Sequence, residues 1–525
     1  MAGRGRFASL LGAALPPDQL TILSGAGLNV AGLVVAVIAT FASQILLTRV
    51  LGPSGYGVVY LATQVAFVGA AFTRFGMDMA AVREVAIAEG AGESGRSRAI
   101  VNRAAGIAAA VSAVAAAGVW LAAGPIADGA TVPDQAAGAF RAAALGLPFV
   151  ALAQVYLAGT RGLKQMRPTL LIYWAGQPLA WIALILAGFA FTPSAEIGTA
   201  AYSGSWIFAT AAAYFAWCRR SAGFPRVAPP AGETSRLLRY GAPRAPAALF
   251  AQLLFVVDLF VLARYVPAAE YGVYAAASRV SLLVVVFLTS VALVFSPFVA
   301  DLYARGEREC LGRLFQLLTR ATFALTLPII LVLLVLPGPV LRLFGEDFST
   351  GGARTALLVL IGGQAVNVLA GSVGFVLVMV GRTGWDALVY TASLALDLAL
   401  AFWLIPEHGL LGAAIAQAVT LVASNALRVW LVWRAVGIQP FSRAYAFLLV
   451  PAGAGAAAMA ALHLALGDGS WPVDLAVSAL GGAVVYGVAL LLAGLPAAER
   501  TAVRRLLRGL RGRAPEPSPE ERPEA

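Results

Sequence analysis

Long apolar stretches, separated by short polar turns, run through almost the whole chain. An α-helix needs about 20 mostly apolar residues to cross a bilayer, and fourteen stretches come close to that length. Apolar and polar residues do not alternate with a period of two, so an outer-membrane β-barrel is not indicated. The expected spans are 22–47, 57–77, 104–124, 138–159, 169–191, 198–217, 245–264, 272–300, 321–344, 354–380, 387–405, 410–431, 444–466 and 474–497. The pattern therefore predicts an all-α, polytopic membrane protein with about 14 transmembrane helices.

A short motif recurs at a fixed distance along this pattern. Tyr56-Gly57-Val58 returns as Tyr271-Gly272-Val273, and 271 − 56 = 215. Arg49 stands seven residues before the first tyrosine, and Arg264 stands seven before the second. The repeat predicts two copies with six spans each. Because six is an even number, both copies enter the membrane in the same orientation, and their symmetry axis runs along the membrane normal.

We expect five parts along the chain. Two pseudo-symmetric six-helix lobes occupy residues 1–217 and 245–431, and a basic, proline-rich cytoplasmic linker at 218–244 joins them. Two extra transmembrane helices without a counterpart follow at 444–497, and a cytoplasmic tail at 498–525 ends the chain. A duplicated chain that is almost entirely apolar is typical of a transporter.

Composition and charge support the membrane location and add an orientation. Hydrophobic residues make up 60% of the chain and charged residues 12%, whereas soluble domains carry about 25% charged residues. The net charge of +11 does not indicate nucleic-acid binding, because most basic residues fall in turns on one side of the membrane. The turns on the other side hold only Arg49, Arg141, Arg264 and Arg354. This bias predicts that both termini are cytoplasmic.

Signatures of chemistry are scarce. The chain has no GxxxxGK[ST] phosphate loop, and its two cysteines, Cys218 and Cys310, match neither a disulfide framework nor metal-ligand spacing. The two histidines, His408 and His463, are isolated. The loops are short, so a membrane enzyme would lack room for acid–base residues outside the bilayer. We therefore expect neither a catalytic site nor a cofactor or metal.

Two stretches resemble a known family. Leu47–Gly57 (LTRVLGPSGYG) closely resembles the signature at the end of the first helix of the bacterial polysaccharide flippases of the O-antigen (Wzx) type. Leu404–Ala414 (LIPEHGLLGAA) resembles a second family pattern, in which His408 replaces the usual tyrosine. The family belongs to the superfamily that includes the multidrug-and-toxin extruders and the lipid II flippases.

The resemblance implies a fold and a function. The fold would be two six-helix bundles around a central cavity, often with two added helices. The function would be to flip undecaprenyl-diphosphate-linked oligosaccharide from the inner to the outer leaflet of the bacterial inner membrane, by alternating access of the two lobes. The partners implied are this lipid-linked oligosaccharide, membrane lipids, and the polymerase and glycosyltransferases of glycan assembly. We also expect a monomer.

Cationic residues are the candidates for binding the diphosphate, because arginine pairs with phosphate in a forked geometry. Arg49 and Arg264 form a symmetric pair, either at a basic outer mouth or reaching to lipid phosphates. Arg279 lies inside a span, and its repeat partner is Gln64, so this position is polar in both lobes. Arg74 could receive the phosphate at the inner leaflet, or it could reach the interface and pair with Asp78.

Two intramembrane carboxylates are candidates for ion coupling. Asp258 lies in the seventh expected span and Asp397 in the eleventh. Either could bind a coupling Na⁺ or proton, as carboxylates inside membranes often do. Alternatively, Asp258 could form an ion pair with Arg264 or Arg279.

Two other functions remain open from the sequence. An exporter of cationic drugs would have a cavity lined by carboxylates and aromatic residues, whereas an arginine-lined cavity favours the flippase. A membrane enzyme of glycan assembly is the second alternative, and the short outer loops argue against it.

Overall fold

The computed structural model describes residues 17–130, 136–227, 232–242, 244–466 and 470–492, and no strand occurs in these ranges. The chain divides into two compact units. The larger unit is Gly32–Pro440, and the smaller one combines Met1–Ala31 with Phe441–Ala525. The expected lobe at 245–431 and residues 32–217 of the other expected lobe fall inside the larger unit, whereas residues 1–31 are assigned to the smaller one. The boundaries expected between the lobes and the linker stay predictions.

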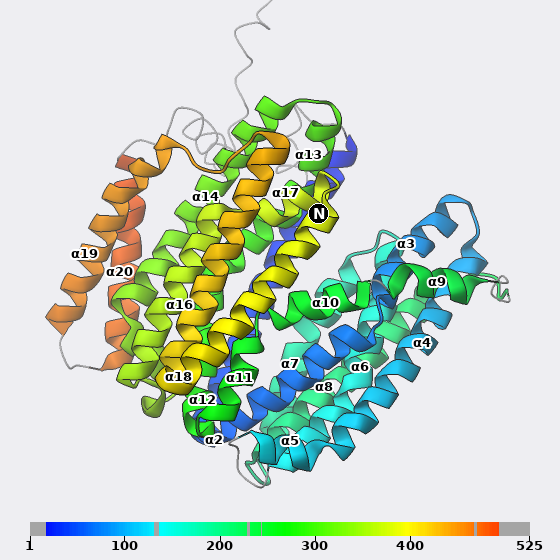
Figure 1. Cartoon of the computed structure of the whole chain (residues 1–525), viewed down its shortest axis with the longest axis horizontal. Coiled ribbons are helices and arrows are strands. Elements are labelled where there is room, and N and C mark those ends of the chain that lie inside the picture. The colour runs from blue at the N-terminus through cyan, green and yellow to red at the C-terminus, as the bar shows by residue number, and fades with distance from the viewer. Residues whose placement is uncertain (1–16, 131–135, 228–231, 243, 467–469, 493–525) are drawn as a thin grey trace, which may run out of the picture. The chain divides into compact units, whose positions relative to one another are not determined.

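The first part of the larger unit, up to Arg220, is called the N-lobe here (Figure 1). Its elements are α2 (Pro17–Thr73), α3 (Met77–Gly90), α4 (Ser94–Leu121), α5 (Ala123–Gly129), α6 (Ala136–Gly162), the π-helix η1 (Thr169–Gly176), α7 (Gln177–Phe189) and α8 (Ala195–Arg220). A short helix, α9 (Glu233–Gly241), forms within the expected linker. α6 packs between α4 and α8.

The part from Arg244 to Val436 is called the C-lobe. Its elements are α10 (Arg244–Leu253), α11 (Val257–Tyr265), α12 (Ala268–Ser281), the 3₁₀-helix η2 (Leu282–Val285), α13 (Val286–Ala304), α14 (Arg308–Val335), α15 (Pro337–Arg342), the 3₁₀-helix η3 (Glu346–Phe348), α16 (Gly351–Ala370), α17 (Val373–Met379) and α18 (Thr383–Val436). α18 packs against both α11 and α16.

Two pairs of expected spans are joined by a single glycine instead of a turn of several residues. Gly52 has φ 65° within α2, and Gly409 has φ 52° within α18. Only glycine adopts a positive φ at little cost, and Pro53 follows Gly52 with the φ that the start of a helix needs. Spans 22–47 and 57–77 are therefore the two arms of α2, and spans 387–405 and 410–431 are the arms of α18.

Several other spans are interrupted in their regular helical structure, among them those at 169–191, 245–264, 272–300, 321–344 and 354–380. The span at 169–191 begins with the π-helix η1, and the span at 245–264 breaks between α10 and α11. The span at 272–300 changes to the 3₁₀-helix η2 directly after α12. Irregular backbone at membrane depth is tolerated where it is buried in protein or lines a cavity. Each interruption is therefore expected either to be packed against protein or to line a cavity.

The N-lobe core is built from small and aliphatic side chains around one large aromatic residue. Val85, Ile100, Val155, Trp217 and Leu237, which come from α3, α4, α6, α8 and α9, are all buried in one cluster. Leu237 belongs to α9, so this helix contributes to the N-lobe core.

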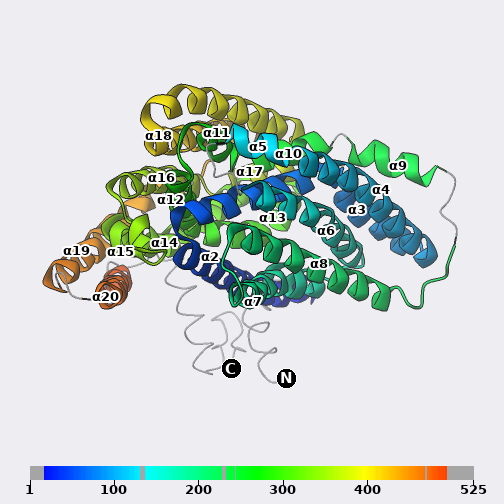
Figure 2. The same cartoon turned by 90° about the horizontal axis from the view of Figure 1, so that it is seen from below.

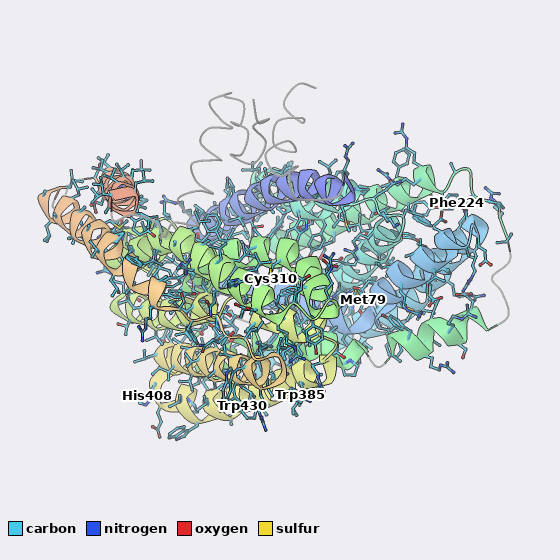
Figure 3. All side chains as sticks on the ribbon, turned by 90° about the horizontal axis from the view of Figure 1, so that it is seen from above. Met79, Phe224, Cys310, Trp385, His408 and Trp430 are labelled. Atoms are coloured by element: carbon cyan, nitrogen blue, oxygen red, sulfur yellow. The ribbon has the colours of Figure 1, made fainter. Side chains whose placement is uncertain are left out.

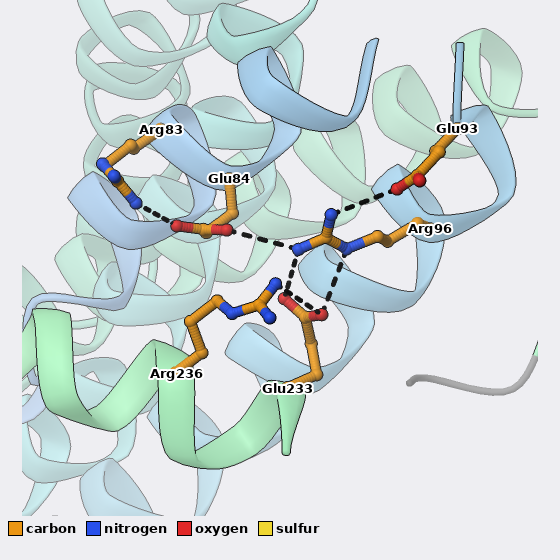
Figure 4. A network of polar contacts seen from close by, with 6 residues as sticks. All are labelled: Arg83, Glu84, Glu93, Arg96, Glu233 and Arg236. Atoms are coloured by element: carbon orange, nitrogen blue, oxygen red, sulfur yellow. Dashed lines mark hydrogen bonds and ion pairs between the residues drawn. The ribbon is translucent and has the colours of Figure 1, made fainter. Parts of the chain in front are cut away.

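Buried ion pairs also hold α9 against the N-lobe (Figure 4). Arg96 of α4 donates from Nε to Glu233 of α9 at 3.1 Å, and its Nη2 lies 3.5 Å from Glu84 of α3. Glu84 and Glu233 are both buried, with 2% and 1% of their side chains exposed. Arg83 and Arg236 contact the same two carboxylates. The first helix of the linker is thus fixed to the N-lobe.

The smaller unit contains a helical hairpin. The 3₁₀-helix η4 (Arg443–Leu448) leads into α19 (Leu449–Leu466), and α20 (Trp471–Leu492) packs against α19 (Figure 2). His463 Nδ1 lies 2.8 Å from Asp474 Oδ2, and the Ser478 hydroxyl donates to Asp474 Oδ1 at 3.0 Å. Polar contacts of this kind hold membrane helices together.

Ten helices in the described ranges are long and apolar enough to cross a membrane. Two of them, Val35–Thr73 and Thr383–Val436, contain the glycine kinks. The expectation of an all-α, multi-pass membrane protein is confirmed, whereas the number of fourteen spans stays a prediction.

Candidate substrate cavity

A cavity of ≈ 410 Å³ lies between the N-lobe and the C-lobe. The N-lobe contributes residues of α2, η1, α7 and α8, and the C-lobe contributes residues of α10, α12, η2 and α13. Three of the interrupted spans supply lining residues: Tyr173 from η1, Phe255 from the break before α11, and Leu282 from η2. In these three spans the irregular backbone is next to the cavity, where its unpaired polar groups are not exposed to lipid.

Arg279 is the one charged residue among those that line the cavity in the described part of the chain. Its guanidinium lies over the ring of Tyr60, with Cζ 5.3 Å from the ring centroid. Its Nε is buried and has no hydrogen-bond partner. The same set of lining residues includes no carboxylate. The cation is therefore held by an aromatic face and has bonding capacity left for an anion.

Gln64 lines the same cavity from α2. The repeat relates Gln64 to Arg279, since 64 + 215 = 279, so the polar position of each lobe reaches the cavity. Gln44, Gln177 and Gln252 add further amide groups to the lining. Of these, Gln44 accepts a hydrogen bond from the Tyr56 hydroxyl at 2.8 Å, and Gln177 donates to Ser205 at 2.9 Å.

Five aromatic side chains of the N-lobe form one side of the cavity, which is called the aromatic wall. The wall consists of Tyr173 and Trp174 on η1, Trp181 on α7, and Tyr202 and Trp206 on α8. Ring centroids are 5.0 Å apart for Tyr173 and Trp174, 5.6 Å for Tyr173 and Trp206, and 5.1 Å for Trp181 and Tyr202. These are ordinary separations for tilted and edge-to-face ring pairs, so the wall is a packed surface.

Arg49 and Arg264 lie outside the residues that line this cavity, and each connects one lobe to the other. Arg49 of α2 donates to the carbonyl oxygens of Leu343 at 2.9 Å and Arg342 at 3.2 Å, at the end of α15. Arg264 of α11 donates to the carbonyl oxygen of Gly129 at 2.8 Å, at the end of α5. The acceptors lie at similar places in the repeat, because 129 + 215 = 344 and Leu343 immediately precedes that position. The two arginines therefore form a pseudo-symmetric pair of contacts between the lobes.

The two copies of the Tyr-Gly-Val motif meet at the same end of the larger unit. A Cβ atom on Gly57 would lie 3.2 Å from the Gly272 nitrogen, and a Cβ atom on Gly272 would collide with the Pro53 carbonyl. The sequence indicates a repeat but not this contact between its copies. At the other end, α3 and α9 lie apart from α13 and α17 (Figure 1). The lobes are thus in close contact at the end that the charge pattern assigns to the outside.

Arg74 also lies outside the cavity lining. Its Nη1 is 3.5 Å from Asp78 Oδ2, one helical turn away, which confirms the pairing expected from the sequence. Arg428 of α18 is only 9% exposed. Its guanidinium lies over the Tyr390 ring at 4.6 Å and pairs with Asp386 at 3.4 Å. A buried counter-charge that the sequence alone did not reveal accounts for this burial.

Asp258 and Asp397 are buried in one polar cluster of the C-lobe, away from the cavity lining. Asp258 accepts a hydrogen bond from the Tyr274 hydroxyl at 2.5 Å. Asp397 lies beside Thr420 and within electrostatic range of Asp258, yet neither of its carboxylate oxygens has hydrogen-bond geometry to a partner. The Gln417 side-chain oxygen is unpartnered too. Among the ion pairs of the described residues, none joins Asp258 to Arg264 or Arg279.

A family comparison places the chain in a known group. Residues 22–303, more than half of the chain, match the family model described as "Polysaccharide biosynthesis protein", and residues 243–403 match the MatE family model.

Curated relatives share about a quarter of their residues with this chain over the matched regions. A "Putative O-antigen transporter" of Shigella flexneri is 24% identical over 202 residues, which cover 38% of this chain and 47% of that protein. A "Probable flippase AglR" of Haloferax volcanii is 26% identical over 253 residues, which cover 45% and 49%. The chain thus spans about half the length of these relatives.

Solved structures share its fold over longer stretches. The lipid II flippase MurJ in an inward closed conformation superposes with a TM-score of 0.70 at 14% identity, covering 92% of this chain and all of that chain (100%). An inward-facing multidrug resistance MATE transporter of the MOP superfamily gives a TM-score of 0.65 at 13% identity, covering 76% and 94%. Because the family model spans more than half of the sequence, the chain belongs to the polysaccharide biosynthesis protein family of the MOP exporter superfamily.

Proposed function

We propose that this protein moves the polar head of a lipid-linked oligosaccharide across the membrane through the cavity between its lobes. The lipid tail stays in the bilayer while the diphosphate and glycan pass through the protein. The names of the curated relatives, an O-antigen transporter and a flippase, support a transporter of glycan precursors and not an enzyme. An undecaprenyl diphosphate carrier in the bacterial inner membrane is the cargo and location that fit this proposal.

The observation that carries the proposal is Arg279 in a cavity without a lining carboxylate in the described residues. A cationic side chain inside the bilayer costs about 2.5–3.5 kcal/mol on insertion scales. A buried arginine at this depth is therefore a candidate for a functional role. Its unpartnered Nε supports a role in binding an anion, and a diphosphate is the anion of this class of cargo.

An exporter of organic cations is the second candidate, because aromatic rings line the cavity and because the MATE fold is similar. Aromatic faces attract cationic ligands. Arg279 opposes this function, since a like charge in a small cavity repels a cationic ligand. The diphosphate cargo therefore fits the charge of the cavity better.

Alternating access of the two lobes is the transport cycle that we propose. Arg49, Arg264 and the contact between Gly57 and Gly272 would keep the outer end closed while the inner ends are apart. Breaking these contacts and closing the inner ends would expose the cavity to the other side. Asp258 and Asp397 would couple this movement to a Na⁺ or proton gradient.

Export of surface polysaccharide tests the proposal. A strain that lacks this gene should lose surface polysaccharide and accumulate lipid-linked glycan inside, and the wild-type gene should restore export. Arg279→Ala should abolish export at a normal protein level, because it removes the cation of the cavity. Trp430→Leu, a change at a residue that is 52% exposed on α18, is the matched control and should export normally (Figure 3). Normal export by Arg279→Ala would remove this residue from the site.

A further inference from the structure

We infer that the aromatic wall is a glycan subsite that contacts the sugar nearest to the diphosphate, so that the protein selects its cargo by this first sugar. The inference rests on the proposed function, because it assumes that a lipid-linked sugar enters the cavity. The two sides of the cavity would then bind different parts of the cargo. Arg279 in the C-lobe binds the phosphate, and the aromatic wall in the N-lobe binds the sugar.

The chemistry of the wall matches a sugar ring. A pyranose has an apolar face of C–H groups, surrounded by hydroxyl groups. Tyrosine and tryptophan combine a broad apolar ring with one polar tip, so they can contact such a face and bond to a hydroxyl at its edge. All five wall residues are joined by ring contacts, from Trp181 through Tyr202, Trp206 and Tyr173 to Trp174.

The backbone presents two of these rings in an unusual way. Tyr173 and Trp174 lie on the π-helix η1, and π-helical turns occur frequently at functional sites. Trp174 remains 37% exposed although it lines the cavity. The π-helix therefore adds aromatic surface to the cavity without completely burying it in the N-lobe.

Trp206 supplies an unused hydrogen-bond donor. Only 3% of this residue is exposed, yet its Nε1 has no hydrogen-bond partner, although the Tyr202 hydroxyl lies nearby. By contrast, Trp181 Nε1 donates to the Gly198 carbonyl oxygen at 3.2 Å. A buried donor without a partner is unfavourable, so the Trp206 indole can bond to the nearby Tyr202 hydroxyl or to an acceptor on a ligand in the cavity. Sugar hydroxyl and acetamido oxygens are such acceptors.

The phosphate-binding residue and the aromatic wall belong to one cavity. Tyr202 of the wall and Arg279 both line this cavity of ≈ 410 Å³. A phosphate bound at Arg279 would thus place its attached sugar beside the wall. The cavity volume of ≈ 410 Å³ lies near the low end of the range for ligand pockets, about 300–1,000 Å³. The cavity therefore fits a diphosphate with its first sugar better than a whole oligosaccharide.

Binding to the purified full chain in lipid nanodiscs tests the inference. The probes are a short-chain prenyl diphosphate and the same diphosphate carrying a single hexose or a single N-acetylhexosamine. We expect at least one sugar-bearing probe to bind wild type about tenfold more tightly than the bare diphosphate, as ring contacts and one hydrogen bond would provide. Trp206→Leu should remove most of this gain and leave the affinity for the bare diphosphate unchanged.

Two further variants and a control separate the contributions. Trp206→Phe keeps a ring but lacks the donor, so it should keep part of the gain, and it preserves the test if Trp206→Leu fails to fold. Arg279→Gln should weaken all probes by a similar factor. Trp430→Leu, outside the cavity, should bind like wild type.

The outcomes distinguish the inference from the proposed function. The inference is overturned if no sugar increases the affinity of wild type, or if the Trp206 variants weaken bare and sugar-bearing probes equally. The proposed function itself falls, and the inference with it, if wild type binds no diphosphate probe or if Arg279→Gln leaves every affinity unchanged.

Discussion

At the scale of single residues, a position whose residue type differs between the two copies of the repeat identifies the cavity better than a position that both copies share. Arg49 and Arg264, which the repeat preserves, lie at contacts between the lobes, whereas Gln64 and Arg279, which differ between the copies, line the cavity. The repeat therefore let the sequence predict the position of Arg279. It could not predict the aromatic wall, because Tyr173 and Trp206 come together only through the packing of η1 and α8.

The carboxylates of the C-lobe carry a prediction about energy coupling. Asp397→Asn should lose at least about tenfold of gradient-driven transport, equivalent to 1.4 kcal/mol, because the neutral amide can neither take up a proton nor balance a bound cation. The measurement is translocation of labelled lipid-linked glycan in vesicles, with a Na⁺ or a proton gradient imposed. Asp347→Asn, at an exposed site, is the control. Turnover by wild type that stays constant when both gradients are collapsed would exclude coupling at this cluster.

At the scale of secondary-structure elements, short helices and their ends connect the lobes. α5 and α15 each end in carbonyl oxygens that accept hydrogen bonds from an arginine of the opposite lobe. A cation at a helix C-terminus contributes about 0.3–1 kcal/mol. Two such contacts are strong enough to bias the lobes toward one arrangement and weak enough to break during a transport cycle.

Removing both arginines should therefore shift the balance between conformations. We expect Arg49→Ala combined with Arg264→Ala to favour opening at this end roughly threefold to thirtyfold, from the loss of about 0.6–2 kcal/mol. Distances between spin labels placed on either side of the contact would measure the shift. Arg313→Ala provides the control, because Arg313 pairs with Glu309 within α14. An unchanged distance distribution in the double variant would show that these contacts do not hold the end closed.

The linker helix α9 carries a prediction about stability. Arg96→Met leaves Glu84 and Glu233 buried with less positive charge beside them, and breaking a buried pair in this way costs about 3–5 kcal/mol. Thermal unfolding of the purified protein should show a lower midpoint, and limited proteolysis should cut sooner near α9. The control Arg305→Met affects an ion pair with Asp301 that is largely exposed and should have little effect. Equal stability of both variants would mean that the network does not anchor α9.

The sequence was a good guide to which segments are helical but a poor guide to how the helices are interrupted. The apolar pattern predicts the helices, because burial in lipid requires it. It does not predict that Gly52 and Gly409 replace whole turns, or that η1 is a π-helix, because these features depend on backbone angles and tertiary packing.

At the scale of the whole molecule, the account depends on a cavity between two related lobes. The sequence repeat predicts that the lobes are related, and the cavity between them has one cation on the C-lobe side and a wall of aromatic rings on the N-lobe side. The fold is similar to those of a lipid II flippase and a multidrug transporter. Because proteins of one fold can carry different substrates, the residues that line the cavity must determine the cargo.

Translocation in vesicles containing only the purified protein tests the central claim most directly. The measurement follows a fluorescent, undecaprenyl-diphosphate-linked oligosaccharide from one leaflet to the other by its accessibility to a membrane-impermeant quencher. The account predicts translocation by wild type and by Trp430→Leu, and a loss of at least about tenfold in Arg279→Gln, equivalent to 1.4 kcal/mol. Equal rates in protein-free vesicles and wild type, or an undiminished rate in Arg279→Gln, would contradict it.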